Sequence, residues 1–325
     1  MPRERGGTTG QAANGGEARA VSLEAKCGPE PIGPAVRSKR GNDADELSAG
    51  LYIVATPIGN AEDITLRALK MLRAVDLIAC EDTRVSATLM ARHGITTRRV
   101  AYHEHNAERM RPLLLSRIES GAAIALISDA GTPLVSDPGF KLVREAVARG
   151  LKVTAAPGPS APLAALVLAG LPTERFLFAG FLPPKEAARR RALDELKSVP
   201  ATLVFLESAP RLAAALADMA AVLGDRPAAI ARELTKLHEE IRRARLTALA
   251  AQYQESGPPK GEIVVLVGPP EAESAIVAED ALDAALTAAL ARMSIKDASA
   301  AVAAATGLPR RTVYARALAL AGRGQ

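Results

Sequence analysis

The sequence predicts an α/β protein with two α/β domains and a small helical module near the C-terminal end. From residue 51 to residue 155, short apolar runs alternate with amphipathic stretches, which is typical of a mostly parallel sheet with helices on both faces. Strand-like runs beyond residue 170 follow a different pattern, with a basic stretch and an alanine-rich helix between them. Two alanine-rich helices around a glycine turn come last, a helix-turn-helix pattern.

These patterns define the expected domains. Residues 1–47 are rich in Gly, Ala, Arg and Glu without apolar periodicity, and we expect a disordered extension there. The other boundaries place α/β domains at 48–165 and 166–270, and the helix-turn-helix-like module at 279–322.

Each element has its own signal of apolar period and turn residues. In the first domain we expect strands at 51–55, 76–80, 99–102, 124–127 and 151–155. Helices are expected at 64–74, from 84 to 93, and at 110–120, 140–148 and 161–171. Later strands are expected at 176–181, 202–206, 228–232 and 262–267, with helices at 211–223, 295–303 and 310–320.

Composition limits the class of protein. The chain has 325 residues, is 48% hydrophobic and carries a formal charge of +5, which permits an anionic partner. Residues 292–325 alone contain six basic residues and one acidic residue. Cys27 and Cys80 lack metal-ligand spacing, so we expect a reducing, cytoplasmic setting. Residues 1–16 have no apolar core and the uncharged segment 153–173 contains four prolines, so neither a signal peptide nor a membrane span is expected.

The loop at residues 128–139 (SDAGTPLVSDPG) is the clearest candidate for a ligand site. It joins an expected strand to an expected helix, for which Asp137 is predicted as the N-cap and Pro138 as the first residue. Gly131 allows close approach to the backbone, and Asp129 supplies a carboxylate. Ligands of α/β sheets bind outside the carboxyl ends of the strands. A simple turn would explain the glycine and proline equally.

Four other segments show the same arrangement of small, polar or charged residues after an apolar run. They are residues 56–60 (TPIGN), 81–84 (EDTR), 157–160 (PGPS) and 207–211 (ESAPR). If the strands are parallel, the first three converge with loop 128–139 on one edge of the sheet. Adjacent carboxylates at Glu81 and Asp82 favour a ligand or catalytic role, although Glu81 and Arg84 can also form a structural ion pair.

Other types of site are absent or weak. The sequence has no phosphate-binding P-loop, no GxGxxG dinucleotide turn and no GxSxG nucleophile elbow. His103 and His105 lie two residues apart, but a metal site needs a further ligand, and we expect no metal. Binding of an anionic substrate, proton transfer and a plain exposed loop remain open for these histidines.

Together the motifs resemble the ribosomal RNA small subunit methyltransferase I family of the tetrapyrrole methylase superfamily. The resemblance spans residues 50–322 and continues through the segments at 178–183, 205–211, 232–236 and 260–262. It implies a class III methyltransferase that binds S-adenosylmethionine in the cleft between two α/β domains. The implied reaction methylates the ribose 2′-hydroxyl of a decoding-site cytidine in 16S ribosomal RNA of the small subunit, by a cytoplasmic homodimer.

The resemblance and the chemistry of the residues together give a set of candidate site residues. The N–H groups at the start of the helix at 161 suit the carboxylate of the methyl donor, and by analogy the adenine lies near residue 206 and the 259–261 turn. The cofactor-binding candidates are Pro57, Asp129, Gly131, Thr132, Pro133, Ser160, Ala161, Leu206, Pro259 and Gly261.

The catalytic candidates are Asp82, Glu81 and Arg84. A ribose hydroxyl is a poor nucleophile at neutral pH, so a base is expected. Asp82, or else Glu81, is predicted to accept the proton, while Arg84 holds a phosphate or the carboxylate.

The C-terminal module is predicted to contact the RNA backbone through residues near the start of its second helix, Arg310, Arg311, Tyr314 and Arg316. It can also be a packing unit. Two other functions stay open: a methyltransferase for a small molecule of tetrapyrrole type, and a helix-turn-helix regulator with a ligand-sensing core. The basic module and the basic stretch at 185–191 count against the small-molecule alternative.

Overall fold

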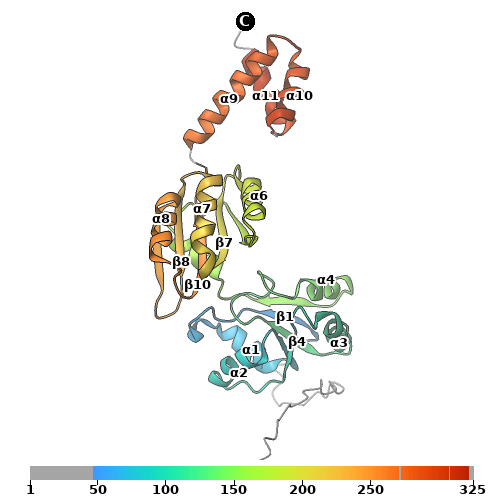
Figure 1. The fold of residues 1–325 in the computed structure, drawn as a ribbon. Coiled ribbons are helices and arrows are strands. Elements are labelled where there is room, and N and C mark those ends of the chain that lie inside the picture. Colours follow the sequence, from blue (N-terminus) through green and yellow to red (C-terminus); the bar gives the residue numbers. More distant parts are fainter. Residues whose placement is uncertain (1–46, 271, 307, 322–325) are drawn as a thin grey trace, which may run out of the picture. The chain divides into compact units, whose positions relative to one another are not determined.

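The computed structural model describes residues 47–270, 272–306 and 308–321, all within one of the two units into which the chain divides, Arg37–Gln325 (Figure 1). Of the expected disordered extension, residues 1–46 lie outside the described residues. So does residue 322 at the end of the expected helical module.

The first α/β region is a five-stranded sheet in which every pair of neighbouring strands is parallel, in the order β3-β2-β4-β1-β5. All residues of β2 and β4 are buried, as their unbroken apolar sequences predict for a parallel sheet. The strands are β1 (Gly50–Val54), β2 (Leu77–Cys80), β3 (Arg99–Ala101), β4 (Ala123–Ile127) and β5 (Val153–Ala156).

The helices of this region follow the strands in alternation, as predicted. They are η1 (Ala61–Asp63), α1 (Leu66–Ala74), α2 (Thr83–Arg92), α3 (Ala107–Glu119) and α4 (Phe140–Ala148). Side chains cap three of them: Asn60 accepts from Glu62 N at η1, Thr65 from Ala68 N at α1, and Asp82 from Arg84 N at α2. Apolar side chains of α1 and α2 pack in one cluster with Tyr52, Ile78 and other strand residues.

The second α/β region is a mixed sheet in the order β6-β7-β10-β8-β9, in which only β6 and β7 pair in parallel. Its strands are β6 (Phe176–Phe181), β7 (Thr202–Ser208), β8 (Pro227–Arg232), β9 (Glu240–Arg245) and β10 (Glu262–Val267). Its helices are α6 (Glu186–Leu196), η2 (Ala209–Arg211), α7 (Leu212–Leu223) and α8 (Leu246–Ser256).

Two apolar clusters cover the two faces of this second sheet. Phe205 and Val265 belong to the cluster with α6, α7 and α8, whereas Val204 and Val264 belong to the cluster with α5 (Ala161–Leu168). The alternation follows from the two-residue period of a strand. Ile58, from the loop after β1, also packs in the α5 cluster. The loop at 56–60 therefore joins the core of the second sheet.

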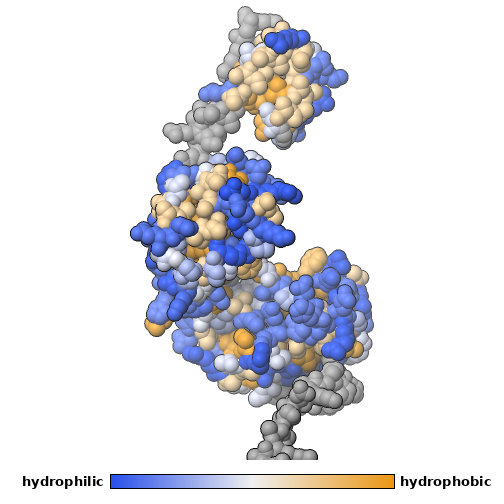
Figure 2. All heavy atoms as spheres, viewed as in Figure 1, coloured by the Kyte–Doolittle hydropathy of each residue, from blue (hydrophilic) through white to orange (hydrophobic). Residues whose placement is uncertain are grey.

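The C-terminal module consists of α9 (Ala272–Leu290), α10 (Ile295–Thr306) and α11 (Arg310–Ala321). Leu286, Val302 and Val313 are buried in its small core. Figure 2 shows a pale-orange surface on this module, in keeping with its many alanines. Among the described helices, none combines the length and hydropathy needed to cross a membrane.

Candidate functional site

The loops after three parallel strands are joined by hydrogen bonds at one edge of the first sheet, as predicted. Thr56 and Gly131 form an isolated antiparallel bridge, with N–O distances of 2.9 and 3.0 Å. Thr56 Oγ1 donates to Ser128 O at 3.1 Å, and Thr132 Oγ1 donates to Pro159 O at 3.0 Å. These bonds hold the loops after β1, β4 and β5 together.

Loop 128–139 has an unusual backbone. Leu134 and Ser136 have φ angles of 72° and 63°, in the left-handed region that disfavours residues with a side chain, and Gly131 has φ 80°. A β-carbon built on Gly131 lies 3.2 Å from Ile58 Cγ2, so the close approach predicted for this glycine is to another loop of the protein. Strain at two non-glycine residues is typical of functional loops.

The prediction that Asp137 caps α4 is wrong. The N-cap is Gly139, with φ 134° and no capping side chain, and Pro138 lies outside the helix, which begins at Phe140. A β-carbon on Gly139 lies 2.8 Å from Leu126 Cδ2, so this position needs glycine. The tight entry moves Asp137 away from the helix end, and its side chain lines a cavity instead.

That cavity has a volume of about 490 Å³, which suits a small ligand. Its walls come from the loops of the first sheet, the start of α5 and the strands of the second sheet. Six of the predicted cofactor-binding residues line it: Gly131, Thr132, Ser160, Ala161, Leu206 and Gly261.

The other four predicted cofactor-binding residues, Pro57, Asp129, Pro133 and Pro259, are not among the described residues that line this cavity. Asp129 accepts a hydrogen bond from Asp82 N at 3.1 Å, which ties the loop after β4 to the loop after β2. The roles assigned to these four residues stay predictions.

Sequence reasoning gave no site role to several residues of the cavity wall, although two of them lie in segments that it had singled out. Phe181 and Leu234 are apolar lining residues, and Asp137 and Glu207 are carboxylates in the lining. Glu207 follows four apolar residues of β7 and precedes Ser208, so the polar end of a buried strand was the available signal.

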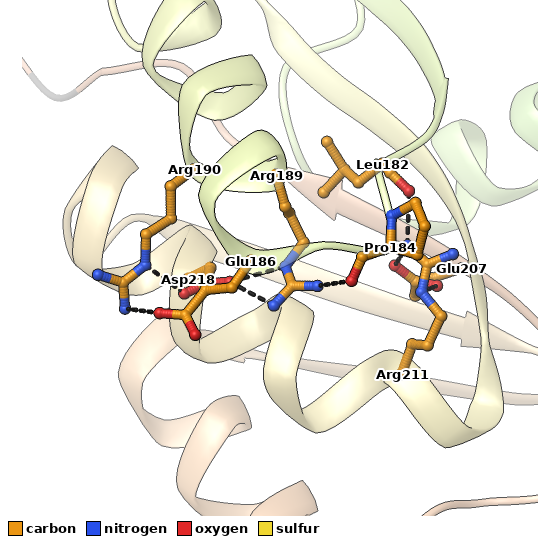
Figure 3. Close-up of polar contacts among 8 residues, drawn as sticks. All are labelled: Leu182, Pro184, Glu186, Arg189, Arg190, Glu207, Arg211 and Asp218. Carbon is orange, nitrogen blue, oxygen red and sulfur yellow. Dashed lines mark hydrogen bonds and ion pairs between the residues drawn. The ribbon is translucent and has the colours of Figure 1, made fainter.

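Glu207 is held in place by a local network, shown in Figure 3. Its side chain is 1% exposed and lies 3.3 Å from Arg211 Nε, and its Oε1 accepts from Ser208 N at 2.8 Å. Arg211 Nη2 also donates to Leu182 O at 2.5 Å. A buried carboxylate needs such partners.

The predicted catalytic segment shows an exposed ion pair. Arg84 Nη2 lies 2.8 Å from Asp82 Oδ2, and the Arg84 side chain is 90% exposed. Hydrogen bonds from the side chain and backbone of Arg84 lower the pKa of Asp82 to about 2. Asp82 therefore serves as a helix cap and as the partner of Arg84, and its carboxylate is a weak base.

Glu81 and Asp137 have the opposite character. Burial, followed by the charge of Asp129, raises the pKa of Glu81, while His103 opposes the rise. Burial, followed by the charge of Glu81, raises the pKa of Asp137 to about 6, and a hydrogen bond with Ser128 opposes this shift. Residues after β2 and β4 thus contribute neighbouring carboxylates, two of which hold protons more tightly than usual.

The histidines of the 103–106 segment lie in a turn after β3. The rings of His103 and His105 meet edge to face with their centroids 6.0 Å apart, and His103 N donates a hydrogen bond to Asn106 Oδ1 at 3.0 Å. Among the described residues, no three His, Cys, Asp or Glu side chains gather as metal ligands would.

Part of the basic stretch at 185–191 is structural (Figure 3). Arg189 is buried, and its Nη2 lies 2.5 Å from Asp218 Oδ2. Arg190 Nε lies 2.6 Å from Asp218 Oδ1. The pattern of basic residues on α6 therefore owes much to one buried carboxylate of α7.

In the C-terminal module, Arg316 forms a bidentate pair with Asp283, with distances of 2.6 and 2.7 Å. This pair joins α11 to α9, and the RNA contact of Arg316 stays a prediction. Arg310, Arg311 and Tyr314 are exposed at and after the start of α11.

Comparison with known proteins agrees with this fold. A family model described as "Tetrapyrrole (Corrin/Porphyrin) Methylases" matches residues 50–250, and one described as "RsmI C-terminal HTH domain" matches residues 276–321. A crystal structure of diphthine synthase, 18% identical, aligns with a TM-score of 0.52 over 67% of this chain and 89% of that chain, which shows the fold alone.

Curated relatives are much closer in sequence. The chain is 53% identical over 278 residues to ribosomal RNA small subunit methyltransferase I of Mesorhizobium japonicum, covering 85% of this chain and 94% of the relative. It is 48% identical over 283 residues to the protein of the same name from Pseudomonas aeruginosa, covering 85% and 100%. The predicted fold class and resemblance are confirmed, and the chain belongs to the ribosomal RNA small subunit methyltransferase I family, among the tetrapyrrole methylases.

Proposed function

We propose that the protein transfers a methyl group from S-adenosylmethionine to the ribose 2′-hydroxyl of a decoding-site cytidine in 16S ribosomal RNA, within the small ribosomal subunit. The observation that carries this proposal is the cavity that six predicted cofactor-binding residues line. Family membership supports the reaction, because the relatives are named as ribosomal RNA small subunit methyltransferases.

The cavity fits the methyl donor in size and chemistry. The N–H of Ala161 lies in the first turn of α5, where it suits a carboxylate, and Ser160 makes no capping hydrogen bond with its side chain. Leu206 and Leu234 provide apolar surface for an adenine, and Gly261 lines the cavity as well, with the Glu233 side chain packed where a β-carbon would lie. Pro57, Asp129, Pro133 and Pro259, in the adjoining loops, are the further candidates for binding the donor.

The donor supplies a methyl group on a cationic sulfur, and the protein supplies position and a proton acceptor. In-line displacement depends chiefly on holding the hydroxyl and the methyl group in line. Acidic residues beside the cavity favour a cation there, and Arg84, which is exposed, is placed to contact an RNA phosphate. Glu81 and Asp82 remain candidates for accepting the proton, together with a third carboxylate treated below.

The RNA is held mainly by charge and shape. Aromatic residues make up only 3% of the chain, which leaves few platforms for base stacking. Arg310 and Arg311 contact the RNA backbone from the C-terminal module.

The protein works in the cytoplasm as a homodimer. The apolar side chains of Leu163 and Val167, 50% and 74% exposed on α5, support a self-association surface.

The decisive experiment incubates the purified protein with labelled S-adenosylmethionine and small subunits from cells that lack the gene. Nuclease digestion and mass spectrometry then locate the methyl group. A single 2′-O-methylcytidine at the decoding site is expected. Binding of the donor without any label in RNA would instead favour a small-molecule methyltransferase or a ligand-sensing regulator.

A further inference from the structure

Asp137 lies at the cavity and does not cap helix α4. Its side chain lines the cavity, and Gly139 takes the N-cap position. The residue before it, Ser136, is held at φ 63°, and Leu134 at φ 72°. The strained backbone at these two residues costs stability and holds the Asp137 carboxylate at the cavity wall.

The surroundings of Asp137 suit a base. Glu81 after β2 and Asp129 after β4 are the charged groups that act on it, and Ser128 is its hydrogen-bond partner. Burial and the charge of Glu81 raise its pKa to about 6. Such a group is ionised at neutral pH, yet holds a proton far better than an ordinary aspartate.

The other carboxylates discussed at this cavity, Asp82, Glu207 and Glu262, each have a basic side chain as partner. Asp82 has both oxygens bound by Arg84, with distances of 2.7 and 2.8 Å to its N and Nη2. Glu207 lines the cavity, but Ser208 N and the guanidinium of Arg211 hold its oxygens. Glu262 also lines the cavity, and its Oε2 accepts from Lys236 Nζ at 3.1 Å. Asp137, by contrast, has Ser128 as its side-chain hydrogen-bond partner and forms no ion pair with a basic residue in the described part of the chain.

We propose that Asp137 accepts the proton of the ribose 2′-hydroxyl during methyl transfer, an assignment that rests on the proposed function. The hydroxyl oxygen forms a bond to the methyl carbon as the carbon–sulfur bond breaks. The electron pair of that bond stays on sulfur, which becomes the neutral thioether of S-adenosylhomocysteine. The hydroxyl proton passes to the Asp137 carboxylate and leaves to water after release of the product.

The test compares Asp137→Asn, Asp137→Glu and the matched control Asp194→Asn, an exposed residue of α6. Methylation of small subunits gives kcat, and calorimetry gives the affinities for S-adenosylmethionine and S-adenosylhomocysteine. We expect Asp137→Asn to lower kcat by roughly 10²- to 10⁴-fold with both affinities kept, and Asp137→Glu to recover part of the loss. Asp194→Asn should behave as the wild type.

The pH profile of the wild-type protein is a second readout. Below pH 6, kcat/KM for the methyl donor should fall by about tenfold per pH unit, because the donor-free protein then carries a protonated Asp137. The residual kcat/KM of Asp137→Asn should not show this fall below pH 6.

Several results overturn the assignment. They are an unimpaired kcat in Asp137→Asn, a loss of donor affinity that accounts for the whole loss of rate, or a wild-type profile that stays flat to pH 5. If the wild-type protein methylates no small subunits while binding the donor, the proposed function fails and the assignment falls with it. Wild-type methylation with an active Asp137→Asn overturns the assignment alone.

Discussion

At the scale of single residues, the position of one carboxylate has opposite effects on chemistry and on stability. The pKa of Asp137 is raised from 3.8 to about 6, so the folded protein disfavours its ionised form. The resulting loss of stability is absent below pH 3.8, grows as the pH rises, and is complete above pH 6. Asp82 shows the reverse shift, because Arg84 favours its ionised form.

Asp137→Asn should therefore stabilise the protein at pH 7.5. The full pKa shift of Asp137 corresponds to about 3 kcal/mol. Because the side chain is partly exposed, we expect the substitution to raise the free energy of unfolding by about 1 kcal/mol. Urea unfolding at pH 7.5 and pH 4 measures it, and the gain should shrink at pH 4. Asp194→Asn is the control. A loss of stability at pH 7.5, or an equal gain at both pH values, would contradict the sign of the shift.

At the scale of elements, a buried carboxylate joins α6 to α7. The side chains of Asp218 and Arg189 are 4% and 7% exposed and lie 2.5 Å apart. Asp218→Ala leaves the guanidinium buried without its partner and should lower the free energy of unfolding by roughly 3–5 kcal/mol. Asp194→Ala, at an exposed position of α6, should change it by less than about 0.5 kcal/mol in the same urea titration. Equal effects of the two substitutions would refute a structural role for the pair.

A second contact between elements sets the cavity walls. A β-carbon on Gly59 lies 2.5 Å from Lys236 Cγ, 2.8 Å from Thr235 Oγ1 and 3.0 Å from Leu234 O, and Asn60 N donates to Thr235 Oγ1. Because Ile58 and Leu234 line the cavity, Gly59→Ala should push its walls apart.

We expect Gly59→Ala to weaken binding of S-adenosylhomocysteine by about tenfold and to cost about 1–3 kcal/mol of stability. Calorimetry and urea unfolding measure the two effects. Gly150→Ala, at φ 66° with open space around it, should cost stability without changing affinity. The same affinity in both variants would show that this contact leaves the cavity unchanged.

Sequence patterns predicted the elements with strong local signals. The predicted bounds of α4, β6 and β10 agree with the structure, because apolar period and turn residues coincide there. The strand β9 was missed, since EIRRAR carries three arginines and is stabilised as an edge strand by pairing with β8. Helix α8 was missed as well, because its apolar face appears only once β8 and α7 are in place.

The lining of the cavity was predictable where glycine and small residues follow a strand, as at Gly131 and Ser160. It was not predictable where a carboxylate after a strand can either cap the next helix or line the cavity, because the tertiary packing decides between the two. Asp137 was predicted as a helix cap and Asp82 as a catalytic base, yet Asp82 is the cap of α2 and Asp137 lines the cavity. Gly139, whose approach to Leu126 excludes a β-carbon, fixes this outcome.

At the scale of the whole molecule, positive charge is concentrated in the C-terminal module. Residues 292–325 contain six basic residues, of which Arg316 forms an ion pair with Asp283. Arg310 and Arg311 remain exposed at the start of α11, where phosphate contacts would release counterions. The module therefore should contribute to affinity for the small subunit and not to the chemical step.

The double variant Arg310→Ala/Arg311→Ala should raise KM for small subunits roughly tenfold, while kcat at saturation stays unchanged because neither residue lines the cavity. The slope of log affinity against log salt should become shallower by about 2, one for each lost phosphate contact. Lys70→Ala/Arg92→Ala, at exposed positions of α1 and α2, is the matched control for loss of two positive charges. If both pairs change KM and the salt slope alike, the effect is one of net charge. A lower kcat with an unchanged KM would instead assign the module to the reaction itself, and the division between binding and chemistry would be wrong.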